Sequence, residues 1–248
     1  MNTYRMNAVM TGILYFLGTV FGVSGGLIGG EVLASLISGK PLTGVDMLGI
    51  VAANSSRLTW GAFLTFMMGI SLVAMTVFLY PVMRKASKEL AMGMVLFRGA
   101  LEGIFYFLST LTILTLIMIG NEYIATGADS AVLQTIGNIL YQFETLKAPI
   151  SSILFLIGAT CIYLAFYRTR LIPRWLSVWG FIAVITSLAS ALLKFFHLDT
   201  GIGFYLEILV MFPQEIVMAV WLIVKGFNPP AIAAGLPKQI KHSVTAQP

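Results

Sequence analysis

Arg98 and Glu102 stand four residues apart in the apolar stretch LFRGALEGIFYF, residues 96–107. A charged side chain near the middle of a membrane helix costs about 2.5 to 3.5 kcal/mol, so the two together would cost roughly 5 to 7 kcal/mol if they had no partner. Residues four apart lie on one helix face, so the two charges can pair. The same face continues to Tyr106 and Ser109, and such a stripe must face the inside of a helix bundle.

A second set of polar residues interrupts the last apolar stretch, where Gln214 and Glu215 follow Pro213. Proline frees a backbone carbonyl, which water, neighbouring helices or polar side chains must satisfy at membrane depth. Glu102 and Glu215 would share one arginine, which leaves one negative charge over and opens a way to bind a proton or a cation. The predicted ligand-binding residues are Arg98, Glu102, Gln214, Glu215 and Tyr106.

A further polar group is predicted near the opposite ends of these helices, comprising Asn54, Arg57, Lys194 and Glu207. The two basic side chains can pair with Glu207, or they can extend along apolar surface to the membrane boundary. The sequence leaves both arrangements open.

Other kinds of site find no support in the residue types. The histidines are His197 and His242 and the one cysteine is Cys161, so we expect no metal, no haem and no other cofactor. Glycines recur at a spacing of four in apolar stretches, a pattern typical of close helix packing rather than of phosphate binding. These glycines, which also offer faces for a homo-oligomer, are Gly22, Gly26, Gly30, Gly99 and Gly103.

Composition sets the class of the protein that must position these residues. The chain is 58% hydrophobic and 10% charged, with a mean hydropathy of +0.92, whereas soluble domains are about 25% charged. The apolar runs are continuous rather than alternating, which favours helices over a barrel. We therefore predict an all-α polytopic membrane bundle of about six transmembrane helices. The predicted spans are 8–29, 58–80, 91–119, 149–167, 176–197 and 203–225.

The distribution of basic residues predicts the orientation of the bundle. Alternate loops place ten Lys and Arg residues on one side and three on the other. By the positive-inside rule both termini lie in the cytoplasm, and we expect a multi-pass protein of the inner, cytoplasmic membrane. This asymmetry also accounts for the net charge of +5 without any nucleic-acid partner, so membrane lipids are the expected surroundings.

Segments outside the spans have their own character. Residues 45–57 and 130–147 carry apolar residues at helical spacing, so they either lie on the outer membrane surface or cap the bundle. Residues 229–248 contain several prolines and little apolar periodicity, which predicts a flexible cytoplasmic tail after a single membrane domain over 1–228.

Four stretches also resemble a known family: the segment from NSSRLTWGAFLTFMM, then FRGALEG, LIPRWLSVWGFI and PQEIVMAVWLIVKGFNP. They are similar to the bacterial integral-membrane family of unknown function numbered 4386, over about residues 4–229. The resemblance implies a bacterial multi-helix membrane protein and brings no activity, substrate or catalytic residue. Its marked positions correspond to Asn54, Arg57, Arg98, Glu102, Gln214, Glu215 and Trp221.

Three functional hypotheses follow from these residues. The first is a protein that binds or transports a small molecule, lipid or ion, with Arg98 as an anion or carboxylate anchor, the two glutamates as proton-linked partners and Gln214 as an orienting group. The second is an interaction, stress-response or scaffolding protein whose buried charges only fix the helix register. The third, an enzyme acting on lipid or quinone, lacks a Ser-His or Cys-His arrangement.

Overall fold

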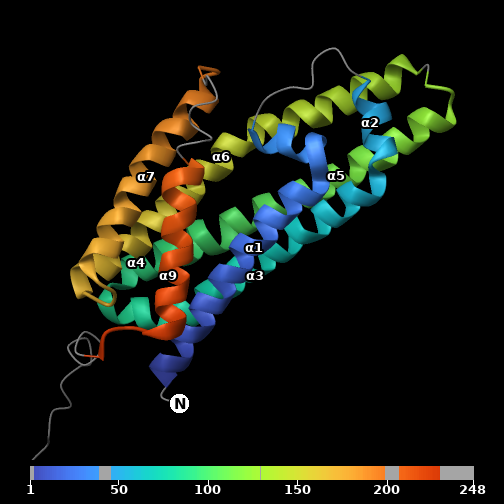
Figure 1. The fold of residues 1–248 in the computed structure, drawn as a ribbon. Helices are drawn as coiled ribbons and strands as arrows, with labels where there is room; N and C mark the ends of the chain where they lie inside the picture. Colours follow the sequence, from blue (N-terminus) through green and yellow to red (C-terminus); the bar gives the residue numbers. More distant parts are fainter. Residues whose placement is uncertain (1–2, 39–45, 129, 199–206, 230–248) are drawn as a thin grey trace, which may run out of the picture.

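Five helices in the part of the chain that the structure describes are long and apolar enough to cross a membrane. The computed structural model describes residues 3–38, 46–128, 130–198 and 207–229, and within these ranges the regular structure is helical throughout. Figure 1 shows the long helices running side by side, with the N-terminus and the end of the last helix at the same end of the bundle. The protein is therefore a helical, polytopic membrane protein, as the composition predicts.

The long helices follow the predicted order; the first four extend beyond the predicted spans, whereas the fifth begins and ends two residues earlier than predicted. The first is α1 (Thr3–Ser38), which carries a kink at Gly30, and the second is α3 (Ser55–Ala86). The third is continuous from Lys88 to Ala125 and consists of α4 (Lys88–Met94), the π-helical segment η1 (Val95–Leu101) and α5 (Glu102–Ala125). The last two are α6 (Ala131–Thr169) and α7 (Arg174–Phe195).

The sixth predicted span, 203–225, is described from residue 207 onwards. It consists of the π-helical segment η2 (Glu207–Met211) and α9 (Phe212–Val224), which together give a shorter apolar helix than the other five. Pro213 stands at the start of α9. Because proline has no N–H and its ring clashes with the carbonyl four residues earlier, the wider π turn before it relieves that clash.

One sequence-based boundary is wrong. Residues 130–147 were separated from the span that begins at 149, whereas the structure joins them in the single helix α6 of 39 residues, with Pro149 inside it. Glu144 and Lys147 form contacts with α5, and neither they nor Pro149 interrupt the helix. At 1.5 Å per residue α6 is about 58 Å long, well beyond the roughly 30 Å hydrocarbon core, so it is tilted or extends out of it.

Short polar residues fix the starts of three helices, α4, α6 and α2. Ser87 accepts a hydrogen bond from Leu90 N (3.2 Å) at the start of α4, and Ser130 accepts one from Leu133 N (3.3 Å) at the start of α6. Asp46 caps α2 (Met47–Ala53), the helix formed by the other predicted amphipathic segment. This helix buries Met47, Leu48 and Val51 and packs on α5, so it caps one end of the bundle.

Neighbouring helices meet through two apolar cores. α1 packs on α3 and α9, α3 on α5, α5 on α6, and α6 on α7. The larger core surrounds Tyr15, Met75, Phe166 and Leu222, and the smaller one lies around Leu48 and Leu116 near α2. Glycines allow the close approaches within the chain: a Cβ at Gly22 would lie 2.7 Å from Met68 Sδ on α3. The predicted tail falls beyond the described residues, apart from Pro229.

A buried ion cluster around Arg98

Arg98 belongs to the π-helical segment η1, and Glu102 is the first residue of α5 after it. Single-turn π segments within α-helices occur frequently at functional sites. Here the widened turn brings the backbone of Arg98 against α6, where a Cβ at Gly158 would lie 2.6 Å from Arg98 N. On the other side a Cβ at Gly99 would lie 2.9 Å from Thr76 Oγ1 on α3. Two glycines thus allow η1 to fit between α3 and α6.

Arg98 and Glu102 form the predicted ion pair, and both are buried, with 3% and 0% of their surface exposed. Arg98 Nη1 donates to Glu102 Oε1. The hydroxyl of Tyr106, one turn further along, donates to the same oxygen at 3.0 Å. The spacing of four residues therefore produces the contacts that the sequence predicts.

Glu215 approaches the other side of the guanidinium from α9. Its Oε1 lies 3.6 Å from Arg98 Nη2, longer than a normal hydrogen bond. The same oxygen accepts a hydrogen bond from Tyr15 Oη of α1 at 2.9 Å. One arginine thus stands between two carboxylates, tightly paired to Glu102 and more loosely to Glu215.

Gln214 lies beside this cluster, fully buried. Its Oε1 accepts a hydrogen bond from Tyr163 Oη of α6 at 2.6 Å, and its Nε2 donates to the carbonyl of Leu176 on α7 at 3.3 Å. Gln214 therefore joins α9 to α6 and α7, and it holds the helix that carries Glu215.

Aromatic rings complete the surroundings of the guanidinium. Arg98 Cζ lies 4.3 Å from the ring centre of Phe155 on α6 and 5.3 Å from that of Tyr15, both within the range of cation–π attraction. Among the residues that the structure describes, Arg98 Nε and Glu102 Oε2 have no hydrogen-bond partner. Helices α1, α5, α6 and α9 therefore meet at one charged centre that retains unused hydrogen-bonding capacity.

Comparison with known protein families identifies the family to which this chain belongs. The family described as "Domain of unknown function (DUF4386)" matches residues 10–226, most of the chain. The chain belongs to the DUF4386 family. No curated protein and no solved structure matches it. The predicted resemblance is thereby confirmed, and the matched DUF4386 region contains every residue of the Arg98 cluster.

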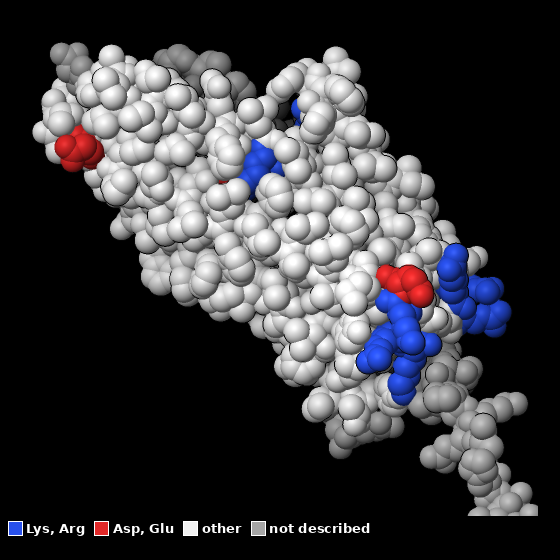
Figure 2. Space-filling model, turned by 180° about the vertical axis from the view of Figure 1, so that it is seen from behind, with Lys and Arg blue, Asp and Glu red and all other residues white. Residues whose placement is uncertain are grey.

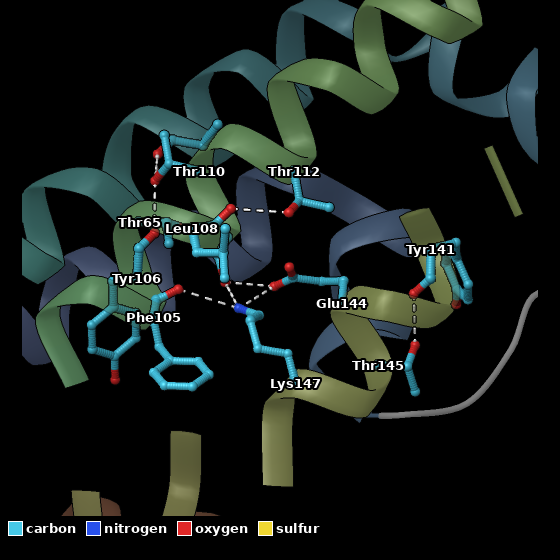
Figure 3. Close-up of polar contacts among 12 residues, drawn as sticks. Thr65, Phe105, Tyr106, Leu108, Thr110, Thr112, Tyr141, Glu144, Thr145 and Lys147 are labelled. Atoms are coloured by element: carbon cyan, nitrogen blue, oxygen red, sulfur yellow. Dashed lines mark hydrogen bonds and ion pairs between the residues drawn. The ribbon is translucent and has the colours of Figure 1, made fainter. Parts of the chain in front are cut away.

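This DUF4386 chain contains a second buried charge cluster, which sequence reasoning did not identify. Lys147 Nζ of α6 lies 2.8 Å from Glu144 Oε1, donates to Ser109 Oγ of α5, and is 3.3 Å from the carbonyl oxygen of Phe105. Ser109 Oγ donates to Glu144 Oε1 at 2.5 Å. Figure 3 shows the Lys147 nitrogen between the two helices, with dashed lines to both. Glu144 Oε2 is buried and without a partner in the described part of the chain.

The other predicted polar group falls at several places in the fold. Asn54 Nδ2 donates to the Ile50 carbonyl and lies at the junction of α2 and α3. Arg57 Nε donates to the Ile28 carbonyl of α1 at 3.1 Å, beside the kink at Gly30 (φ +66°), so Asn54 stabilises the α2–α3 junction and Arg57 the kink in α1. Lys194 lies in the last turn of α7, and the side chain of Glu207 is outside the described residues.

Aromatic partners are the main residues of the Arg98 centre that the sequence did not indicate. Tyr15, Phe155 and Tyr163 have no charged residue within four positions along the chain, and an aromatic residue in an apolar stretch gives no signal by type or spacing. The second cluster did carry a signal. Glu144 and Lys147 are three residues apart, a spacing that places them on one helix face.

Proposed function

We propose that this protein binds a small carboxylate or other small anion at Arg98, together with one proton. The observation that supports this most directly is the unequal pairing of the guanidinium. Glu102 holds one side through a hydrogen bond, whereas Glu215 lies 3.6 Å from the other side and is also held by Tyr15. Glu215 thus occupies the position that an external carboxylate would take at Arg98.

The balance of charges explains why a proton accompanies the anion. With all three groups ionised, Arg98, Glu102 and Glu215 carry a net charge of −1. When Glu215 takes up a proton and an anion pairs with Arg98, the net charge of the site is again −1. The buried site therefore accepts an anion without the large cost of an added charge.

The position of the site favours transport over simple binding. Arg98 lies within a helix that is apolar enough to span a membrane, and its partners come from α1, α6 and α9. Convergence of several helices on a buried ionisable group is typical of substrate and proton pathways in membrane proteins. We place the protein in a bacterial inner membrane, with its basic end in the cytoplasm.

The test compares anion binding in purified protein. Acetate, benzoate and phosphate serve as probes, binding is read as a rise in melting temperature, and small molecules that co-purify are identified by mass spectrometry. Arg98→Lys keeps the charge but loses the planar guanidinium, so we expect at least tenfold weaker binding. Glu215→Gln imitates the protonated carboxyl and leaves the Arg98–Glu102 pair neutral, so binding should persist and lose its dependence on pH.

Glu122→Gln is the matched control, since Glu122 is exposed at the far end of the same helix. It should bind as the unmodified protein does. If no probe stabilises the protein, and Glu102→Gln and Glu215→Gln retain the same co-purified molecules and melting temperature, the charges only fix the helix register. The scaffolding hypothesis then replaces the transport proposal.

A further inference from the structure

The two buried charge clusters lie along one seam between α5 and α6. Lys147 contacts Phe105 and Ser109, whereas Arg98 contacts Phe155 and lies against Gly158. The helices therefore run antiparallel, and this register places Ser151 of α6 level with Glu102. Ser151 is four residues from both Lys147 and Phe155, so it shares their helix face.

Each end of the seam carries a carboxylate with an unused oxygen. Glu102 Oε2 and Glu144 Oε2 are buried, and neither has a hydrogen-bond partner in the described ranges. A buried carboxylate oxygen without a partner is costly, and water or a proton-bearing group commonly satisfies it. Each end of the seam thus holds a buried carboxylate oxygen that needs a hydrogen-bond donor.

The distance between the ends is short enough for a hydrogen-bonded chain. From Glu102 to Ser109 is seven residues, about 10 Å along a helix. The hydroxyl of Tyr106 lies at the Glu102 end, 3.0 Å from Glu102 Oε1, and Ser151 falls between the ends, so about two or three water molecules at normal hydrogen-bond distances would complete the connection. Among the described residues, the ionisable and charged groups with contacts along this seam include Arg98, Glu102 and Tyr106 from the η1–α5 helix and Glu144 and Lys147 from α6, while Glu215 of α9 and Tyr15 of α1 face its Arg98 end.

We propose that the α5–α6 seam is a hydrated proton path, in which the Ser109–Glu144–Lys147 cluster exchanges protons with the membrane face near α2 and passes them to Glu102, which transfers them across the Arg98 site to Glu215. In each step a hydroxyl or water donates one proton onward and receives one from behind, so no net charge accumulates in the seam. This inference rests on the proposed function in one respect, the proton that the Arg98 site takes up with its anion.

Hydration of the seam is tested by cysteine accessibility. In a Cys161→Ala background, Ser151→Cys, Ser109→Cys and Leu111→Cys are reacted in vesicles with a permanently charged methanethiosulfonate, and the rate is followed by mass spectrometry. Leu111 lies on the same helix as Ser109 but is exposed on the outside of the bundle, facing lipid. We expect Ser151→Cys and Ser109→Cys to react at least tenfold faster than Leu111→Cys. Equal rates would overturn the proposal.

Proton passage is tested in vesicles that hold a trapped pH-sensitive dye, with a potassium gradient and valinomycin to set the potential. We expect Glu144→Gln to slow proton movement about tenfold, and Glu122→Gln to leave it unchanged. The double variant Glu144→Gln, Lys147→Met leaves no buried charge unpaired and should also be slow. The proton-path proposal is contradicted if Glu144→Gln moves protons as fast as the unmodified protein does. It is equally contradicted if the unmodified protein moves protons no faster than protein-free vesicles.

The two proposals fail in different ways. If no probe binds at Arg98 while Ser151→Cys stays reactive and proton passage still depends on Glu144, the proposed function is wrong and the proton path stands. Probe binding that keeps its dependence on pH in Glu144→Gln, with Ser151→Cys unreactive, removes the seam and leaves the proposed function.

Discussion

Arg98 is the residue around which the other groups of the buried site are arranged. Its guanidinium meets two carboxylates and two aromatic rings from four helices, at 3% exposure. Helix spacing predicted that Arg98, Glu102 and Tyr106 lie together, and the polar residues after Pro213 predicted Gln214 and Glu215 as their counterpart. The contacts of Tyr15 and Tyr163 could not be predicted from the sequence. Their partners lie about 200 and about 50 positions away along the chain, so these contacts depend on how the helices pack and leave no local pattern.

At the residue scale, removing the arginine should cost stability. Arg98→Ala leaves two carboxylates in a buried site without their cation, and breaking a buried pair in this way costs about 3–5 kcal/mol. We expect Arg98→Ala to unfold at a correspondingly lower denaturant concentration in detergent. The triple variant with Glu102→Gln and Glu215→Gln removes all three charges and should recover most of the loss. A single variant as stable as the triple one would contradict this account, and Arg84→Ala at the exposed basic end is the control.

The elements that carry the site depart from regular α-helix at two points. η1 contains Arg98, and η2 immediately precedes the turn with Gln214 and Glu215. Pro213 gives a sequence signal for the second, whereas the first depends on the space that Gly158 leaves on α6. Sequence patterns predict where helices run but not which turn widens, because that is decided by the facing helix.

At the element scale, filling that space should displace η1. Gly158→Ala would place its Cβ 2.6 Å from Arg98 N and 2.7 Å from Arg98 Cβ, against backbone that cannot rotate away. Overpacking of this kind costs about 1–3 kcal/mol, although alanine is otherwise the better helix residue. We expect a lower melting temperature and weaker anion binding in Gly158→Ala. Gly22→Ala, which meets the flexible end of Met68, should change neither, and equal effects of the two substitutions would refute the role of Gly158.

The whole molecule separates its charges along the bundle. Figure 2 shows most of the Lys and Arg side chains of the visible face at one end, beside an acidic side chain, with a few basic groups and an acidic group further along the bundle. Sequence reasoning counted Lys147 among the residues of the opposite side, but the structure buries it between α5 and α6. Removing it from that count strengthens the asymmetry on which the predicted orientation depends. The two charge clusters lie at different depths along the same axis, so orientation also decides which cluster a proton meets first.

The orientation can be tested in a bacterial host with reporter fusions. With the basic end in the cytoplasm, green fluorescent protein fused after Asn228 should fluoresce, and alkaline phosphatase at that position should be inactive, because this enzyme needs the oxidising periplasm for its disulfides. Alkaline phosphatase inserted after Gly127, in the turn between α5 and α6, should be active. The reverse pattern would place the Lys147 cluster nearer the cytoplasm. Protons would then reach the Arg98 site from the cytoplasmic side, and coupling to an inward proton gradient would require the opposite order of steps.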